Sequence, residues 1–222
     1  MNMKKIVFLL LATCTIFAVN AQSEKYVKAM EQKLGGLDTI RTVATWQELA
    51  NSFERIADAE KTQWLPYYYA AYSHTMAGYM ISRMQPEGGF ADKTDPEADK
   101  ADALIVKAQA LTKENSEIFC LKKMVATLHM MGDPMNRYQT YGAQATEALE
   151  KAKQLNPENP RVYLLEGQDK LYTPEQFGGS KAEAKVLFEQ AQKKYEAFKP
   201  ESNIHPQWGK QMVGYFIGEA SK

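Results

Sequence analysis

The sequence predicts an all-α protein, built as a stack of about four helical hairpins and closed by a C-terminal helix. The pattern Ala-x-x-x-[Ile/Leu/Phe]-x-x-Ala starts at Ala101, Ala145 and Ala184, so its three copies begin 44 and 39 residues apart. Offsets of four and three residues place the small and large side chains of each copy on one helical face. Helix-capping signals recur, while strand-like alternation is absent. A repeat of this length is typical of stacked units that bury their apolar faces against one another.

The first 21 residues are expected to be a secretory signal peptide. Lys4 and Lys5 precede an apolar run of 14 residues over 6–19, and Val19-Asn20-Ala21 offers small residues for cleavage. The run is shorter than the roughly 20 residues that span a bilayer. We therefore expect the mature chain to start at Gln22 and to be periplasmic or secreted.

The remaining residues, 22–222, are expected to form one helical domain without stable membrane insertion. An alternative concerns the leader, because Leu11-Ala12-Thr13-Cys14 is similar to a bacterial lipobox. In that case the protein would be a lipoprotein anchored through Cys14. Thr13 stands where such motifs prefer Gly or Ala, which favours the cleaved form.

Capping residues mark where the predicted helices begin. Thr45-Trp-Gln-Glu48 and Ser180-Lys-Ala-Glu183 have the spacing of a capping box, and Asp95-Pro96 and Asn159-Pro160 place a capping side chain before a proline at the first helical position. Together with the apolar periodicity, these signals predict four hairpins. The paired helices are 23–34 with 46–60, 64–84 with 96–113, 116–131 with 137–155, and 160–172 with 181–198.

The turns and the end of the chain complete this prediction. Glycine pairs at 35–36, 88–89 and 178–179 are expected to end helices and to reverse the chain. A last helix over 207–219 is expected to cover the exposed end of the stack, as terminal caps do in repeat proteins. Its apolar residues are Trp208, Met212, Tyr215 and Phe216.

The repeats resemble the tetratricopeptide repeat (TPR). Its second-helix signature is matched by Ala145, Leu149, Ala152, Leu155 and Pro157, and the matches extend to Tyr163, Gly167, Leu49, Phe53, Ile56, Tyr67, Ala70 and Ala71. The chain is thus similar to a divergent, exported, Bacteroidetes-type member of the TPR-like superfamily over about residues 40–198. The resemblance implies a right-handed stack with a concave groove. Two features depart from the family: the repeats are longer, and Lys122 and Lys123 occupy positions that are usually small or apolar.

Composition excludes several functions. Removing two leader lysines changes the net charge from 27 − 27 = 0 to 25 − 27 = −2, which gives no electrostatic footprint for nucleic acid. Cys120 is then the last cysteine, so the mature chain has no internal disulfide. The three histidines lie outside metal-ligand spacing, and the carboxylates form no evident acid–base pair. We therefore predict no catalytic residues, no metal and no cofactor.

The aromatic segment 64–79 is the most suggestive local feature. Tyr68, Tyr72 and Met76 share one helical face, away from the expected packing residues Tyr67, Ala70 and Ala71, and we expect Gln168 and Leu171 to look toward the same groove. We therefore predict a non-enzymatic scaffold in the cell envelope that binds an unidentified protein or peptide partner. Three alternatives stay open: a core role for these aromatics, a glycan- or small-ligand-binding protein that uses them for stacking, and an enzyme with its site in the long turns.

Overall fold

The computed structural model describes residues 24–85 and 90–222, and these residues form helices and connections without a β-strand. The expected signal peptide, Cys14 and the Gly88-Gly89 turn lie outside the described residues. The first described element is a helix over 24–34. There follow η1 (Leu37–Thr39), α2 (Val43–Glu60), α3 (Trp64–Arg83), α4 (Ala91–Gln109), α5 (Ser116–Gly132), α6 (Pro134–Arg137), a π-helical turn η2 (Tyr138–Gly142), α7 (Ala143–Leu155), α8 (Pro160–Tyr172), η3 (Glu175–Phe177), α9 (Lys181–Ala197) and α10 (Lys210–Ala220).

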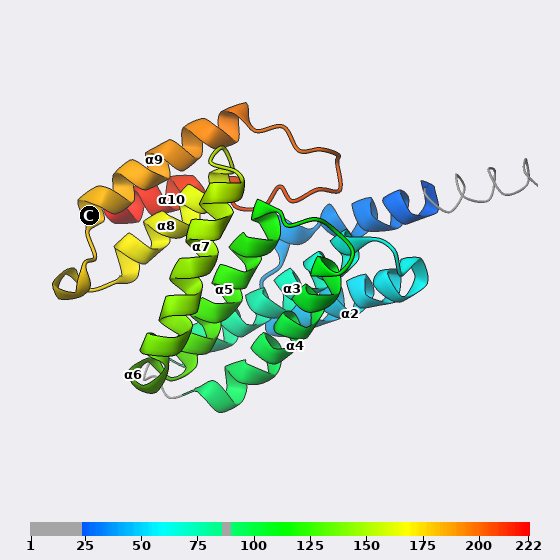
Figure 1. Cartoon of the computed structure of the whole chain (residues 1–222), viewed down its shortest axis with the longest axis horizontal. Coiled ribbons are helices and arrows are strands. Elements are labelled where there is room, and N and C mark those ends of the chain that lie inside the picture. Colours follow the sequence, from blue (N-terminus) through cyan, green and yellow to red (C-terminus); the bar gives the residue numbers. More distant parts are fainter. Residues whose placement is uncertain (1–23, 86–89) are drawn as a thin grey trace, which may run out of the picture.

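Each long helix packs against its neighbours in the sequence, from α2 to α10, so the chain forms a succession of antiparallel helices (Figure 1). The alanines of the repeated pattern lie at these contacts. Ala101, Ala145 and Ala184 are buried, as the pattern predicted. Gly167 of α8 has a similar role, because a Cβ there would lie 2.5 Å from the ring of Phe188 on α9. Small residues therefore allow adjacent helices to approach closely.

Two of the predicted helix starts are confirmed. The Ser180 side chain accepts a hydrogen bond from the Glu183 amide, and the Asn159 side chain accepts one from the Arg161 amide with Pro160 at the first helical turn. Both signals act within one turn of helix, which is why the sequence alone reveals them.

Two other starts were wrong. Thr42, rather than Thr45, caps α2 and accepts a hydrogen bond from the Thr45 amide. Helix α4 begins five residues before Pro96, at Ala91. The additional turn is fixed by contacts far away in the sequence, since the Phe90 amide donates to the Gly132 carbonyl at 3.1 Å and the Phe90 side chain is buried.

The last part of the chain folds back toward its beginning. After α9, residues 198–209, which we call the strap, run to the 24–34 helix and return to α10 (Figure 1). Helix α10 packs against α9 and α8, and Phe216 stacks on Phe188 with ring centroids 5.2 Å apart. The predicted last helix is therefore present, and it begins at Lys210, after Trp208.

A cleft between the two ends of the chain

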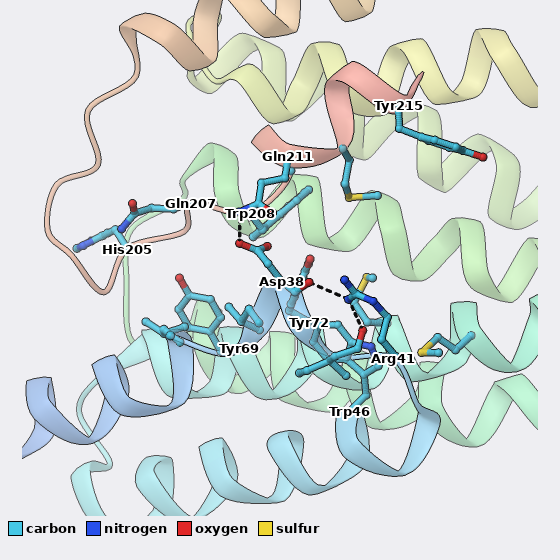
Figure 2. A pocket seen from close by; sticks show the side chains of 18 of the residues that line it. Asp38, Arg41, Trp46, Tyr69, Tyr72, His205, Gln207, Trp208, Gln211 and Tyr215 are labelled. Atoms are coloured by element: carbon cyan, nitrogen blue, oxygen red, sulfur yellow. Dashed lines mark hydrogen bonds between the residues drawn. The ribbon is translucent and has the colours of Figure 1, made fainter. Parts of the chain in front are cut away.

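A cleft of about 1150 Å³ lies where the two ends of the described chain meet (Figure 2). Helix α3 forms its floor. The end of the 24–34 helix, η1 and the start of α2 form one wall, and the strap with α10 forms the other. Elements separated by more than 100 residues in the sequence therefore build one cavity.

The floor is a single stripe of α3. Its residues are Tyr69, Tyr72, Met76, Met80 and Arg83. They follow one another at intervals of three or four residues, which places them on one face of the helix. With a rise of 1.5 Å per residue the stripe is about 21 Å long. It is aromatic at one end, carries two thioethers in the middle and ends in a cation.

The N-terminal wall adds apolar surface from Leu34, Leu37, Ile40 and Trp46. The Trp46 ring meets Tyr72 edge-on, with centroids 5.9 Å apart and planes at 77°. The wall and the floor thus share one aromatic cluster.

Trp208 anchors the opposite wall. Its indole N–H donates a hydrogen bond of 2.8 Å to the Tyr68 hydroxyl, and its ring stacks on Tyr72 at 5.2 Å with an interplanar angle of 26°. The Trp208 carbonyl accepts a 2.9 Å hydrogen bond from the Tyr195 hydroxyl. The next residue, Gly209, has φ = 100°, and a Cβ at this position would lie 2.2 Å from the Tyr195 hydroxyl. Trp208 is therefore held by its side chain and by its backbone.

A buried ion pair between Arg161 and Glu117 packs against Trp208. Arg161 is fully buried and donates to both carboxylate oxygens of Glu117, at 2.7 and 2.6 Å. Its guanidinium also lies 4.7 Å from the Phe198 ring centroid and 5.5 Å from that of Trp208. Burial opposes the charge of Arg161, but the Glu117 carboxylate outweighs it and raises the Arg161 pKa. A charged arginine is therefore stable under the strap.

Two polar contacts join the walls of the cleft. The Gln211 amide donates a 2.7 Å hydrogen bond to the Asp38 carboxylate, and the Asn203 amide donates to the Glu31 carboxylate. Both contacts are exposed, so each contributes only modestly to stability. The walls thus meet through contacts that break readily, whereas Trp208 at the base of the strap is fixed.

Two arginines, Arg41 and Arg83, and two carboxylates, Glu31 and Asp38, line the cleft. Arg41 and Arg83 are exposed, and the arginines that form ion pairs among the described residues are Arg137 and Arg161. Burial raises the pKa values of Tyr69 and Tyr72, so the tyrosines of the floor remain neutral phenols.

The structure separates the residues that the sequence grouped into a groove. Tyr72 and Met76 line the cleft. Tyr68 does not, because its ring is fully buried under Trp208, and the expectation that it faces an open groove is corrected here. Gln168 and Leu171 are partly buried on α8 and lie outside the cleft lining, although Tyr172 at the end of that helix belongs to it.

Several lining residues were not singled out from the sequence. His205 and Gln207 of the strap reach the cleft only because the chain folds back after α9. No local sequence signal predicts that the strap folds back to the 24–34 helix. The apolar spacing of Met80, another lining residue, is likewise indistinguishable from that of ordinary core residues.

The other histidines belong to polar clusters between helices. His74 is buried on α3 and contacts Glu97 of α4 at 2.6 Å and Glu54 of α2 at 3.3 Å. His129 contacts Asp102 at 3.0 Å and Asp95 at 3.4 Å beside a smaller hollow of about 610 Å³. Burial alone would lower the pKa of His129, but these aspartates outweigh it and raise this pKa.

Three further features of the described residues bear on metal binding, thiol chemistry and membrane insertion. Within the described residues, no group of His, Cys, Asp and Glu has an arrangement that could hold a metal ion. Cys120 is buried and unpaired with another cysteine. None of the helices of residues 24–85 and 90–222 combines the length and hydrophobicity that crossing a membrane requires.

Fold and cleft together define a class: an all-helical protein whose two chain ends enclose one large cavity with aromatic and methionine walls and an arginine rim. The chain is similar to the solved structure of the HusA haemophore from Porphyromonas gingivalis, with a TM-score of 0.76 and 32% sequence identity. The match covers 88% of this chain and 92% of the haemophore. The protein therefore belongs to the same family as HusA. No model of a described protein family matches the chain, and no curated protein matches it.

Proposed function

We propose that this protein binds haem or a closely related tetrapyrrole in the cleft and carries it without chemical change. One observation carries the proposal: a large aromatic cleft is present in a chain that is 32% identical to a haemophore over most of its length. A cleft of about 1150 Å³ is slightly larger than the roughly 300–1,000 Å³ typical of small-ligand sites. The cleft is therefore large enough to hold a flat ligand such as haem.

The chemistry of the lining fits a tetrapyrrole. The aromatic cluster of Tyr72, Trp46 and Trp208 contributes apolar surface to the lining, and Met76, Met80 and Met212 offer polarisable thioethers. Thioether and imidazole groups are also known ligands of haem iron, and His205 adds an imidazole to the same cleft. Binding would therefore rest mainly on apolar burial, with iron ligation as an additional contribution.

The test is a titration of the purified mature protein with haemin, followed by the Soret band and by quenching of tryptophan fluorescence. Met76 and Met80 are partly buried on the floor, so replacing both with Gln removes apolar contacts at nearly constant volume. We expect the double variant to bind about tenfold more weakly, which corresponds to about 1.4 kcal/mol. Met84→Gln is the matched control, because Met84 follows the same helix, is 69% exposed and lies outside the lining.

The proposal fails if wild-type protein shows no saturable haemin binding. It also fails if the Met84 variant loses as much affinity as the floor variant, because binding would then be a non-specific association with exposed apolar surface.

A second proposal concerns a protein partner. Met84, Tyr172 and Tyr215 are 69, 65 and 62% exposed, and the two tyrosines also line the cleft. Exposed aromatics beside a ligand site favour a docking surface, in keeping with the envelope scaffold expected from the sequence. A pull-down from envelope extract with wild-type protein and a Tyr172→Ser/Tyr215→Ser variant tests it, since the variant should recover less of any specific partner.

We further propose that the hairpins form a right-handed, TPR-like stack over residues 22–222 and that the protein is exported by cleavage of residues 1–21. The supporting features are the repeated alanine pattern and the form of the leader. Mass spectrometry of envelope protein should give an N-terminus at Gln22. Incorporation of palmitate that is lost in Cys14→Ser would instead establish the lipoprotein alternative.

A further inference from the structure

We infer that Arg41 and Arg83 form a carboxylate clamp that binds one edge of the ligand and so fixes its orientation in the cleft. The inference rests on the proposed function, because it assumes that the cleft is the ligand site. It adds the chemical class of the ligand: a flat apolar molecule that carries its carboxylates along one edge.

The fold brings the two arginines to the same end of the cleft. Helices α2 and α3 run antiparallel: Trp46 contacts Tyr72, while Phe53, further along α2, contacts Tyr69, which lies earlier in α3. The start of α2 and the end of α3 therefore lie at the same end of this helix pair. Arg41 precedes α2 by two residues, and Arg83 is the last residue of α3. Both line the cavity at this end.

Among residues 24–85 and 90–222, neither arginine forms an ion pair. Arg41 donates to the carbonyls of Asp38 and Ile40 at 2.7 and 2.9 Å through a single nitrogen, Nη1, so its other donors remain free. Arg83 is exposed and lies near Tyr172. Burial and Tyr215 raise the pKa of Tyr172, and the positive charge of Arg83 opposes this rise. Arginines held at an aromatic cleft without carboxylate partners are suited to bind the carboxylates of a ligand.

Two acidic residues, Asp38 and Glu31, line the cleft together with the two arginines. Asp38 and Glu31 are each bonded to an amide of the opposite wall, from Gln211 and Asn203. Figure 2 shows the Asp38 carboxylate turned toward Gln211, while the Arg41 side chain extends over the other side of the loop. The cleft is thus amphiphilic: Tyr72, Met76 and Trp208 form an apolar body, and at one end two arginines keep donors that no carboxylate of the described residues occupies.

The experiment compares two probes that differ only in their carboxylates: iron-free protoporphyrin IX and its dimethyl ester. Affinities are measured by tryptophan quenching for wild-type protein and for an Arg41→Gln/Arg83→Gln variant. We expect wild-type protein to prefer the diacid at least about tenfold, because a hydrogen bond between charged groups is stronger than one between neutral groups. The double variant should lose most of this preference while its affinity for the ester stays within about twofold.

Arg55→Gln is the matched control, because Arg55 is exposed on α2, contacts Ser52 at 3.0 Å and lies outside the cleft lining. Its ratio of diacid to ester affinity should equal that of wild type. An unchanged ratio in the double variant overturns the clamp while leaving the proposed ligand site intact. Failure of wild-type protein to bind either probe overturns the proposed function itself, so the two failures are distinguishable.

Discussion

Trp208 decides whether the strap stays closed over the cleft, and Trp208→Ala is therefore the sharpest test of the structure. The side chain is only 7% exposed, although it belongs to a long connection between helices. Removing it deletes the stacking on Tyr72 and leaves the buried Tyr68 hydroxyl without its donor. Truncation of a large buried aromatic costs about 3–5 kcal/mol, and we expect a loss in this range.

Two further variants separate the contributions. Trp208→Phe keeps an aromatic ring against Tyr72 but removes the N–H, so it should cost about 1–3 kcal/mol for the unsatisfied Tyr68 oxygen. Gln207→Ala is the control, because Gln207 is the exposed neighbour in the strap and bonds only to the Asn203 carbonyl at 3.0 Å. It should change stability by less than about 0.5 kcal/mol.

The assay is urea unfolding followed by far-ultraviolet circular dichroism, together with limited proteolysis of the strap. In Trp208→Ala, cleavage within 198–209 should become faster than in Gln207→Ala, since the wall of the cleft has lost its anchor. If Trp208→Ala unfolds at the same urea concentration as the control and the strap stays protected, the anchoring role assigned to Trp208 is wrong.

Three further outcomes follow from buried groups. Ala184→Leu should lower the free energy of unfolding by about 1–3 kcal/mol, because this fully buried alanine has no room for a larger side chain, and urea unfolding measures the loss. His129→Gln should destabilise the protein more near pH 5 than near pH 8. Burial opposes the charge of His129, but the aspartates of α4 outweigh it and raise the pKa of His129 in the folded protein. Its contribution to the free energy of unfolding is therefore full below about pH 6.5 and is lost as the pH rises through the folded-state pKa. Equal losses at both pH values would contradict this assignment. Cys120 should resist a thiol reagent until the protein is unfolded, because burial raises its pKa, and reductant or chelator should leave the circular dichroism unchanged.

The helices could largely be predicted because their signals are local. Ser180 and Asn159 determine helix starts through hydrogen bonds that span two or three residues, and the alanine spacing depends on helix geometry alone. The start of α4 shows where this reasoning stops. Asp95-Pro96 is a good local start, yet the hydrogen bond from Phe90 to Gly132 adds one and a half turns before it.

The cleft could be predicted only in part for a related reason. The sequence marks α3 as unusually rich in aromatics, and the structure places Tyr72 and Met76 in the cleft. Tyr68 and Tyr69 are adjacent, so their directions differ by about 100° around the helix. Both are buried, and which of them lines the cleft depends on where Trp208 lies, 140 residues after Tyr68 in the sequence. No spacing rule within α3 contains that information.

Because the cleft exists only when the two ends of the chain meet, ligand binding and closure of the strap are thermodynamically linked. A ligand that contacts Tyr72 on the floor and Trp208 in the strap binds the closed form and not an open one. At a free ligand concentration one hundred times its dissociation constant, such a ligand adds about 2.7 kcal/mol to the stability of the closed form. That gain is of the same order as the loss expected for Trp208→Phe. Saturating haemin should therefore restore much of the protection of the strap in Trp208→Phe, whereas a ligand bound elsewhere on the molecule would leave its cleavage rate unchanged.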